Sequence, residues 1–107
     1  MKMRKLWVSD YTITLNGKEE PYLVKTSLCN LLFQPALQLN FRELLKAEAI
    51  AKKVEYCGEE YLYLPQADYE VIKRAIETFN NFDRFAVELV RRVEGAEEVE
   101  VEVKEKG

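Results

Sequence analysis

The stretch YTITLNGKEEPYLVKT, residues 11–26, carries the local signal that decides the fold. In its first five residues, large apolar side chains alternate with threonines, a pattern typical of a half-buried strand. The Asn-Gly pair at 16–17 tolerates the positive φ angles of a two-residue hairpin turn. We therefore expect a strand over residues 6–15 and an antiparallel return strand over residues 22–26, with Pro21 at an edge or near the start of the return.

A second strand pattern lies at the other end of the chain, where residues 98–104 read EVEVEVK. One face of this segment is valine and the other is nearly all glutamate, which is typical of a strand with one face buried and one in water. It predicts a strand that joins the sheet of the N-terminal hairpin or pairs with an edge of a partner chain.

Between these strands, apolar residues recur at helical spacing. The pattern predicts helices at residues 28–33, 41–53, 66–79 and 82–93. Ser27 is the expected N-cap of the first helix, and Asn40 with Glu43 has the spacing of a capping box for the second. We expect Leu44 to face inward in that second helix, and Asn80-Asn81 to cap the last one.

Residues 54–64 fit two interpretations. They form a second hairpin that turns at residues 57–60, or the preceding helix continues to Tyr56 and stops at Gly58. Apart from this ambiguity, the patterns predict one α+β domain over residues 1–107. In it, a small antiparallel sheet, made of the N-terminal hairpin plus the C-terminal strand, packs against three or four helices.

Composition limits the class of protein. Hydrophobic residues make up 48% and charged residues 33% of the chain, as in globular proteins. No apolar run approaches the roughly 18 residues of a membrane span, and the first residues lack the apolar core of about 7 to 15 residues of a signal peptide. Two cysteines without a dense cysteine framework agree with a reducing compartment, although a bridge between Cys29 and Cys57 stays open. We expect a cytoplasmic protein with no membrane partner.

The chain contains no histidine, so the commonest general base and metal ligand is missing. Neither Cys29 nor Cys57 has an activating neighbour in sequence. The adjacent acids Glu59-Glu60 and Glu97-Glu98 would point to opposite faces of an extended strand, which does not build a paired-carboxylate site. With no metal-ligand spacing or phosphate-binding loop either, we expect no enzyme and no catalytic, cofactor or metal site.

Binding another protein is the expected function. The predicted helices over residues 66–79 and 82–93 each have a stripe of apolar side chains. Together the two stripes carry more apolar surface than one small sheet covers, and such a surplus favours binding of a partner or of a second copy of the chain. Core packing is the alternative for each residue. The candidate protein-binding residues, which include the C-terminal valines, are Tyr69, Ile72, Ile76, Phe79, Phe82, Phe85, Val99, Val101 and Val103.

A DNA-binding regulator is the alternative function. The helices over 28–33 and 41–53, with a hairpin behind them, resemble a winged helix in outline. The candidate nucleic-acid-binding residues of the second helix are Arg42, Lys46, Lys52 and Lys53. An isoelectric point near 5.1 and the acidic residues of the expected wing count against phosphate binding, so nucleic acid is not the expected partner.

Four segments of the predicted helices resemble a known group of proteins. NFRELLK at 40–46, IAKKV at 50–54, YEVIKRAI at 69–76 and VELVRRV at 87–93 are similar to small uncharacterised proteins of tailed bacteriophages and prophages. The resemblance consists of helix-pattern residues and transfers no site residues. It implies an accessory, assembly or host-interaction role without chemistry, in the cytoplasm of a host cell.

Overall fold

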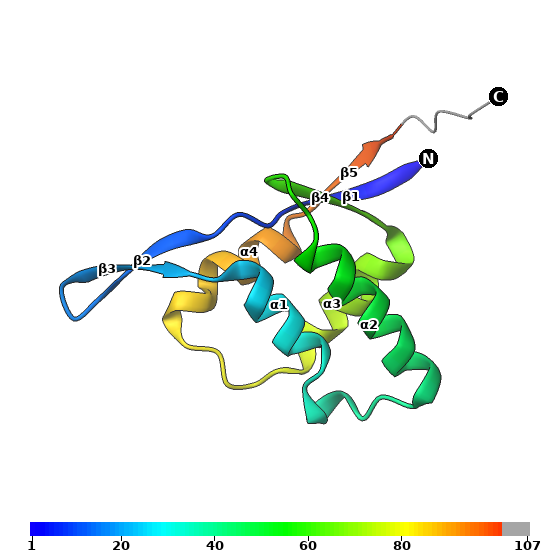
Figure 1. Ribbon diagram of the computed structural model, residues 1–107, viewed down its shortest axis with the longest axis horizontal. Coiled ribbons are helices and arrows are strands. Elements are labelled where there is room, and N and C mark those ends of the chain that lie inside the picture. The colour runs from blue at the N-terminus through cyan, green and yellow to red at the C-terminus, as the bar shows by residue number, and fades with distance from the viewer. Residues whose placement is uncertain (102–107) are drawn as a thin grey trace.

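The computed structural model describes residues 1–101 (Figure 1). In chain order the elements are β1 (Lys2–Trp7), β2 (Tyr11–Leu15), β3 (Lys18–Tyr22), α1 (Val24–Leu32), the 3-10 turn η1 (Pro35–Leu37), α2 (Phe41–Glu55), β4 (Tyr61–Pro65), α3 (Gln66–Thr78), the 3-10 turn η2 (Arg84–Ala86), α4 (Val87–Glu94) and β5 (Glu97–Glu100). Four α-helices with small antiparallel sheets confirm the predicted α+β class.

The main sheet has the strand order β4-β1-β5, and both pairs are antiparallel. Its central strand comes from the beginning of the chain and pairs Leu6 with Leu62 and Arg4 with Leu64. Leu6 and Leu64 are completely buried, so this side of the sheet packs on the helices. The C-terminal strand therefore joins a sheet of its own chain, but it pairs with β1 and not with the predicted hairpin.

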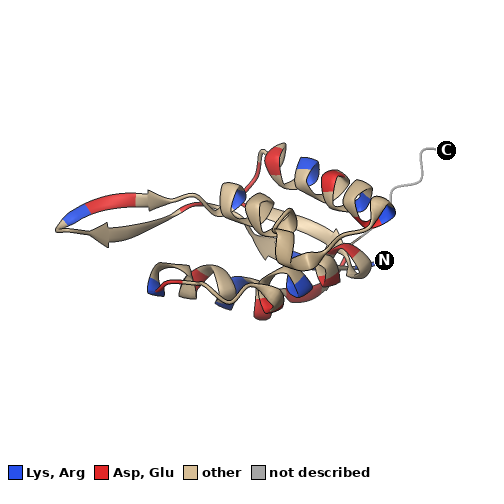
Figure 2. Cartoon of the chain, turned by 90° about the horizontal axis from the view of Figure 1, so that it is seen from below, with Lys and Arg blue, Asp and Glu red and all other residues tan. Residues whose placement is uncertain are grey.

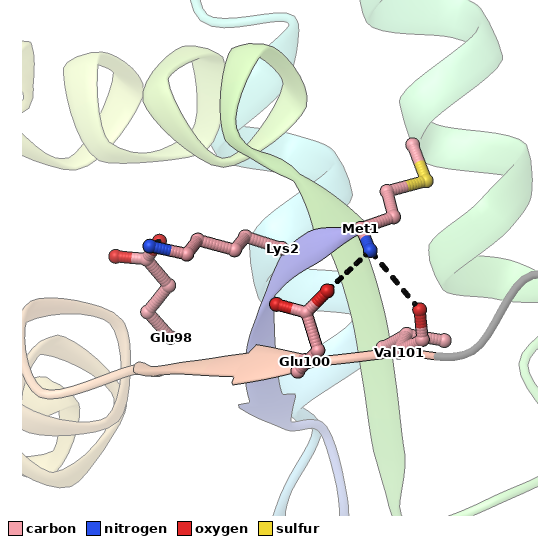
Figure 3. A network of polar contacts seen from close by, with 5 residues as sticks. All are labelled: Met1, Lys2, Glu98, Glu100 and Val101. Atoms are coloured by element: carbon pink, nitrogen blue, oxygen red, sulfur yellow. Dashed lines mark hydrogen bonds and ion pairs between the residues drawn. The ribbon is translucent and has the colours of Figure 1, made fainter.

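The pairing of β5 with β1 ends in polar contacts near the N-terminus (Figure 3). The Met1 amino group donates to Glu100 Oε1 at 2.6 Å and to the Val101 carbonyl at 3.3 Å, and the Val101 N–H donates to the Met1 carbonyl at 2.8 Å. Lys2 lies 3.8 Å from Glu98. The hydrogen bond from the amino group, followed by its charge, lowers the pKa of the Glu100 carboxyl. These contacts align the two ends of the described chain.

The hairpin of β2 and β3 is a separate two-stranded sheet that projects from the body as an arm (Figure 1). Its predicted turn is confirmed, with positive φ angles of 53° at Asn16 and 78° at Gly17. The predicted return strand over residues 22–26 is wrong. Because the turn has only two residues, Lys18 already pairs with Leu15, and the return strand ends where α1 is about to begin.

The strand predicted over residues 6–15 is instead two strands, β1 and β2, separated by a short connection. In this connection the Val8 N–H donates to the Glu60 carbonyl at 2.8 Å, and Asp10 Oδ1 accepts from the Val24 N–H at 2.9 Å. This last bond satisfies the first N–H of α1, so the helix begins at Val24, three residues before the predicted cap Ser27.

The second helix confirms the predicted capping box. Asn40 Oδ1 accepts from the Glu43 N–H at 2.9 Å, and Glu43 Oε1 accepts from the Asn40 N–H at 3.3 Å. The helix continues to Glu55, which supports the longer-helix interpretation of residues 54–64. The alternative hairpin is wrong, because the strand Tyr61–Pro65 pairs with β1 and not with residues 54–56.

The third helix begins at the predicted residue and ends one residue early, at Thr78. The last helix is shorter than predicted, because residues 82–93 contain a 3-10 turn before α4 begins at Val87. The predicted cap Asn80-Asn81 is wrong. Asp83 takes this role by accepting from the Phe85 N–H at 3.0 Å.

One buried cluster of apolar side chains joins the main sheet and all four α-helices. Its largest fully buried members are Leu6, Leu28, Leu32, Ile50, Leu64, Ile72 and Leu89. In α2 the buried positions begin only at Ala47. Leu44 lies before them and is 48% exposed, so the prediction that it faces inward is wrong.

Candidate protein-binding surface

The predicted stripe on α3 belongs to the core. Tyr69, Ile72 and Ile76 are 3%, 1% and 4% exposed, because α3 packs against α1, α4 and the main sheet. The Tyr69 hydroxyl donates to the Val93 carbonyl at 2.6 Å, which satisfies its one polar atom inside the core. These three residues are therefore wrong as binding-surface candidates.

The three phenylalanines of the same prediction are half-buried and lie at two separate places. Phe79 and Phe82 pack edge to face with ring centroids 4.6 Å apart, and both line a shallow hollow of about 260 Å³ beside α1. Phe85 lines a different hollow, beside the base of the hairpin arm. The structure therefore does not bring this trio together as one surface.

The predicted valines of the C-terminal strand are placed only in part. Val99 and Val101 are half-buried, and Val99 pairs with Met3 of β1. Val103 lies outside the described residues. Val99 therefore takes part in the chain's own sheet.

The main sheet carries three exposed aromatic side chains on the side away from the core. Trp7, Tyr61 and Tyr63 are 41%, 36% and 41% exposed. Trp7 pairs with Tyr61, and Lys5 pairs with Tyr63, so the four side chains share one face of the sheet. We call this set of four residues the aromatic face.

Within the aromatic face the rings are held close together. The Trp7 and Tyr61 rings stack with centroids 6.3 Å apart and an interplanar angle of 27°. Lys5 Nζ lies 4.2 Å from the centroid of the Tyr61 ring, within the range of a cation–π contact. The signal that identifies the face is the strict alternation of leucine with aromatic residues in residues 61–64.

Arg92 of α4 packs on the Trp7 ring of the aromatic face. Its guanidinium carbon lies 3.7 Å from the Trp7 ring centroid and 5.0 Å from that of Tyr11. Nε donates to Glu88 at 3.1 Å, and Nη1 donates to the Ser9 carbonyl. With its side chain only 5% exposed, Arg92 fixes the position of the Trp7 ring.

A shallow depression of about 490 Å³ continues from Trp7 toward the hairpin arm and α4. Its apolar lining includes Tyr11, Ile13, Phe85 and Val87, and Val87 is 46% exposed. An extended segment crossing the aromatic face would meet this depression next. The two features therefore form one continuous candidate surface around Trp7.

At the edge of this surface, the Tyr11 hydroxyl donates to the Phe85 carbonyl at 2.5 Å, and its ring stacks on Tyr22 at 4.7 Å. Burial, and next the nearby Tyr22, raises the pKa of Tyr11 to about 12 from 10.0. The folded chain thus retains this proton at a pH where the unfolded chain loses it.

We therefore expect the free energy of unfolding to fall as the pH rises from about 10 to about 12, because the folded state binds more protons in that window. In Tyr11→Phe this part of the decline is absent. Urea denaturation at several pH values measures it. Tyr56→Phe is the matched control, because Tyr56 is 81% exposed, and it should keep the wild-type slope. An unchanged slope in Tyr11→Phe would contradict the assignment.

The candidate nucleic-acid-binding residues are all exposed on α2. By helix geometry, Arg42, Lys46 and Lys53 fall on one face and Lys52 on another. Lys53 Nζ forms an ion pair with Asp68 at 2.7 Å. The structure therefore places three of the four candidate residues on one face of α2, and the charge of one of them, Lys53, is neutralised by Asp68.

The winged-helix outline is wrong for this chain, because residues 54–64 form no hairpin behind α2. Figure 2 shows acidic and basic residues interspersed along the helices. DNA binding itself stays a prediction.

Both cysteines are free. Cys29 is half-buried, and burial, followed by Glu55, raises the pKa of its thiol to about 11. The Cys57 thiol lies 3.4 Å from the Glu59 carbonyl and 3.6 Å from the Tyr61 carbonyl. Within residues 1–101, no group of three or more Cys, Asp or Glu side chains gathers as a metal site would need.

This geometry defines an α+β chain with an exposed aromatic sheet face. Comparisons with known protein families, with curated proteins and with solved structures found no match for it. The resemblance to phage proteins stays a prediction. In the part of the chain that the structure describes, no helix has the length and apolar character needed to cross a membrane.

Proposed function

We propose that this chain is a non-enzymatic protein-binding module of the cytoplasm, an accessory factor that holds its partner on the aromatic face. The observation that carries the proposal is the exposure of Trp7, Tyr61 and Tyr63 on one side of a sheet whose other side is the core. The phage resemblance supports an assembly or host-interaction role for such a module.

Aromatic side chains suit this function because they bury a large area on binding and lose few rotatable bonds. The Trp7 ring is already in contact with Tyr61 of the aromatic face and with Arg92 of α4. Binding therefore costs little further ordering of this ring, which is how a preorganised surface gains affinity. Tryptophan, tyrosine and arginine are also the residues that dominate interface energetics.

The test is affinity capture from the cytosol of the source cell with three baits: wild type, Tyr61→Ala/Tyr63→Ala and Tyr56→Ala. Loss of two hot-spot rings should weaken a partner's binding by at least about thirtyfold, equivalent to roughly 2 kcal/mol. Tyr56 is an exposed tyrosine at the end of α2 and not a member of the aromatic face, so its variant should retain the partner. The same proteins on all three baits, or none on any, would overturn the proposal.

A further inference from the structure

The hollow of about 260 Å³ that Phe79 and Phe82 line lies between α1 and the loop that joins α3 to η2 (Figure 1). Among its lining residues Leu31 and Gln34 are buried, whereas Asp83 is exposed. The first two therefore belong to the floor of the hollow and the third to its rim. We call this space the α1 hollow. It is somewhat smaller than a typical ligand pocket, so it suits a ligand of about one ring.

Gln34, at the floor of the α1 hollow, has a buried acceptor atom without a partner. Its side-chain Nε2 donates to the Leu31 carbonyl at 2.9 Å and to the Ala75 carbonyl at 2.7 Å. These two bonds fix the orientation of the amide, because Oε1 in the place of Nε2 would face two other acceptors. Oε1 itself has no hydrogen-bond partner within residues 1–101, although Gln34 is only 9% exposed. Buried polar atoms are nearly always paired, so a ligand that donates an N–H here would satisfy an unmet requirement of the fold.

Three aromatic rings line the α1 hollow, those of Tyr22, Phe79 and Phe82. All three side chains are half-buried, so each keeps part of its surface open to a ligand. The face of an aromatic ring attracts a cation, and a planar cation such as a guanidinium also stacks on it. The rings therefore favour a flat ligand with a positive charge over an uncharged aliphatic one.

The charge of the lining has the sign that such a ligand needs. Within residues 1–101, Asp83 is the one charged residue that lines the α1 hollow. Its Oδ1 accepts from the Phe85 N–H at 3.0 Å, and the carboxylate forms no ion pair with a residue of the described range. The basic residues closest in sequence contact other parts of the chain: Arg84 lines the depression beside the hairpin arm, and Lys25 Nζ donates to the Cys57 carbonyl. The negative charge at the rim thus remains available to a cation.

We propose that the α1 hollow binds a small planar organic cation, an amidinium or guanidinium group on an apolar body. An N–H of the cation donates to Gln34 Oε1, its plane packs on the aromatic rings, and Asp83 balances its charge. A quaternary ammonium has no N–H for Gln34, and Asp83 repels an anion, so neither fits. The α1 hollow shares no residue with the aromatic face, and this inference is therefore independent of the proposed function.

The test is a titration of isotope-labelled protein with benzamidine, followed through the backbone amide chemical shifts in NMR spectra. Benzamidine should bind with a Kd of about 1 mM, as expected for a one-ring ligand, and should shift the amides of residues 30–34 and 79–86. Benzamide has the same shape without the charge and should bind at least about fivefold more weakly, and benzoate should not bind. Equal binding of benzamide and benzamidine, or shifts confined to other parts of the chain, would overturn the proposal.

Two variants separate the contributions of the charge and of the acceptor. Asp83→Asn removes the charge but keeps an acceptor for the Phe85 N–H, so it should fold normally and weaken benzamidine binding about fivefold. Gln34→Met removes Oε1 at similar volume and should weaken binding about tenfold, with its fold checked by circular dichroism. Glu70→Gln is the matched control, because Glu70 is an exposed acid of α3 outside the α1 hollow, and it should bind as wild type does. Wild-type affinity in Asp83→Asn, or in a folded Gln34→Met, would contradict the proposed site.

Discussion

Replacing Arg92 with alanine should lower the free energy of unfolding by about 3 kcal/mol. The side chain is almost fully buried, and it links α4 to the strand that holds Trp7 and to the connection at Ser9. Charged hydrogen bonds contribute about 1.5 to 3 kcal/mol each, and a desolvated cation–π contact about 2 kcal/mol. The loss is less than the sum of these values, because Glu88 is 43% exposed and regains water.

Arg91→Ala is the matched control. Arg91 is the preceding arginine of the same helix and is exposed, so its loss should change stability by less than about 0.5 kcal/mol. Arg92→Lys should lie between the two, because an ammonium cannot bond Glu88 and Ser9 while also stacking on Trp7. Trp7 is the one tryptophan of the chain, so its fluorescence during urea denaturation reports directly on this contact. Equal midpoints for Arg91→Ala and Arg92→Ala would contradict this role.

The Arg92 contacts also show where sequence reasoning reaches its limit. The Asn-Gly turn and the Asn40 capping box are local signals, set by neighbouring residues, and both are found where predicted. Arg92, by contrast, touches residues more than 80 positions away in sequence, at Trp7 and Ser9. Periodicity places it on a helix but does not identify what that helix packs against.

The same limit explains the errors in the candidate site. The stripe on α3 was correctly predicted to be apolar, but a single sequence does not tell whether an apolar stripe faces the core or a partner. The pairing of β1 with both β4 and β5 makes α3 a core helix and leaves the aromatic face exposed. The start of α1 likewise depends on Asp10, fourteen residues before the N–H that it accepts from.

Two adjacent residues of β4, Leu64 and Tyr63, allow effects on stability to be distinguished from effects on binding. Leu64→Ala should lower the free energy of unfolding by about 3 kcal/mol, because Leu64 is completely buried and its truncation leaves a cavity in the core. Tyr63→Ala should cost less than about 1 kcal/mol, since Tyr63 points to the opposite face and is 41% exposed. Urea denaturation measures both values.

In the capture experiment the larger effect should come from Tyr63→Ala, and Leu64→Ala should have the smaller effect. Leu64→Ala, at a temperature where it is still folded, keeps the aromatic face and should retain the partner. Tyr63→Ala keeps the core but loses one ring of the face, and it should release most of the partner. If both variants lost the partner in proportion to their loss of stability, Tyr63 would be a structural residue and the aromatic face would not be the binding site. The alternation of side chains along one strand makes this separation possible, because neighbouring residues act on opposite sides of the sheet.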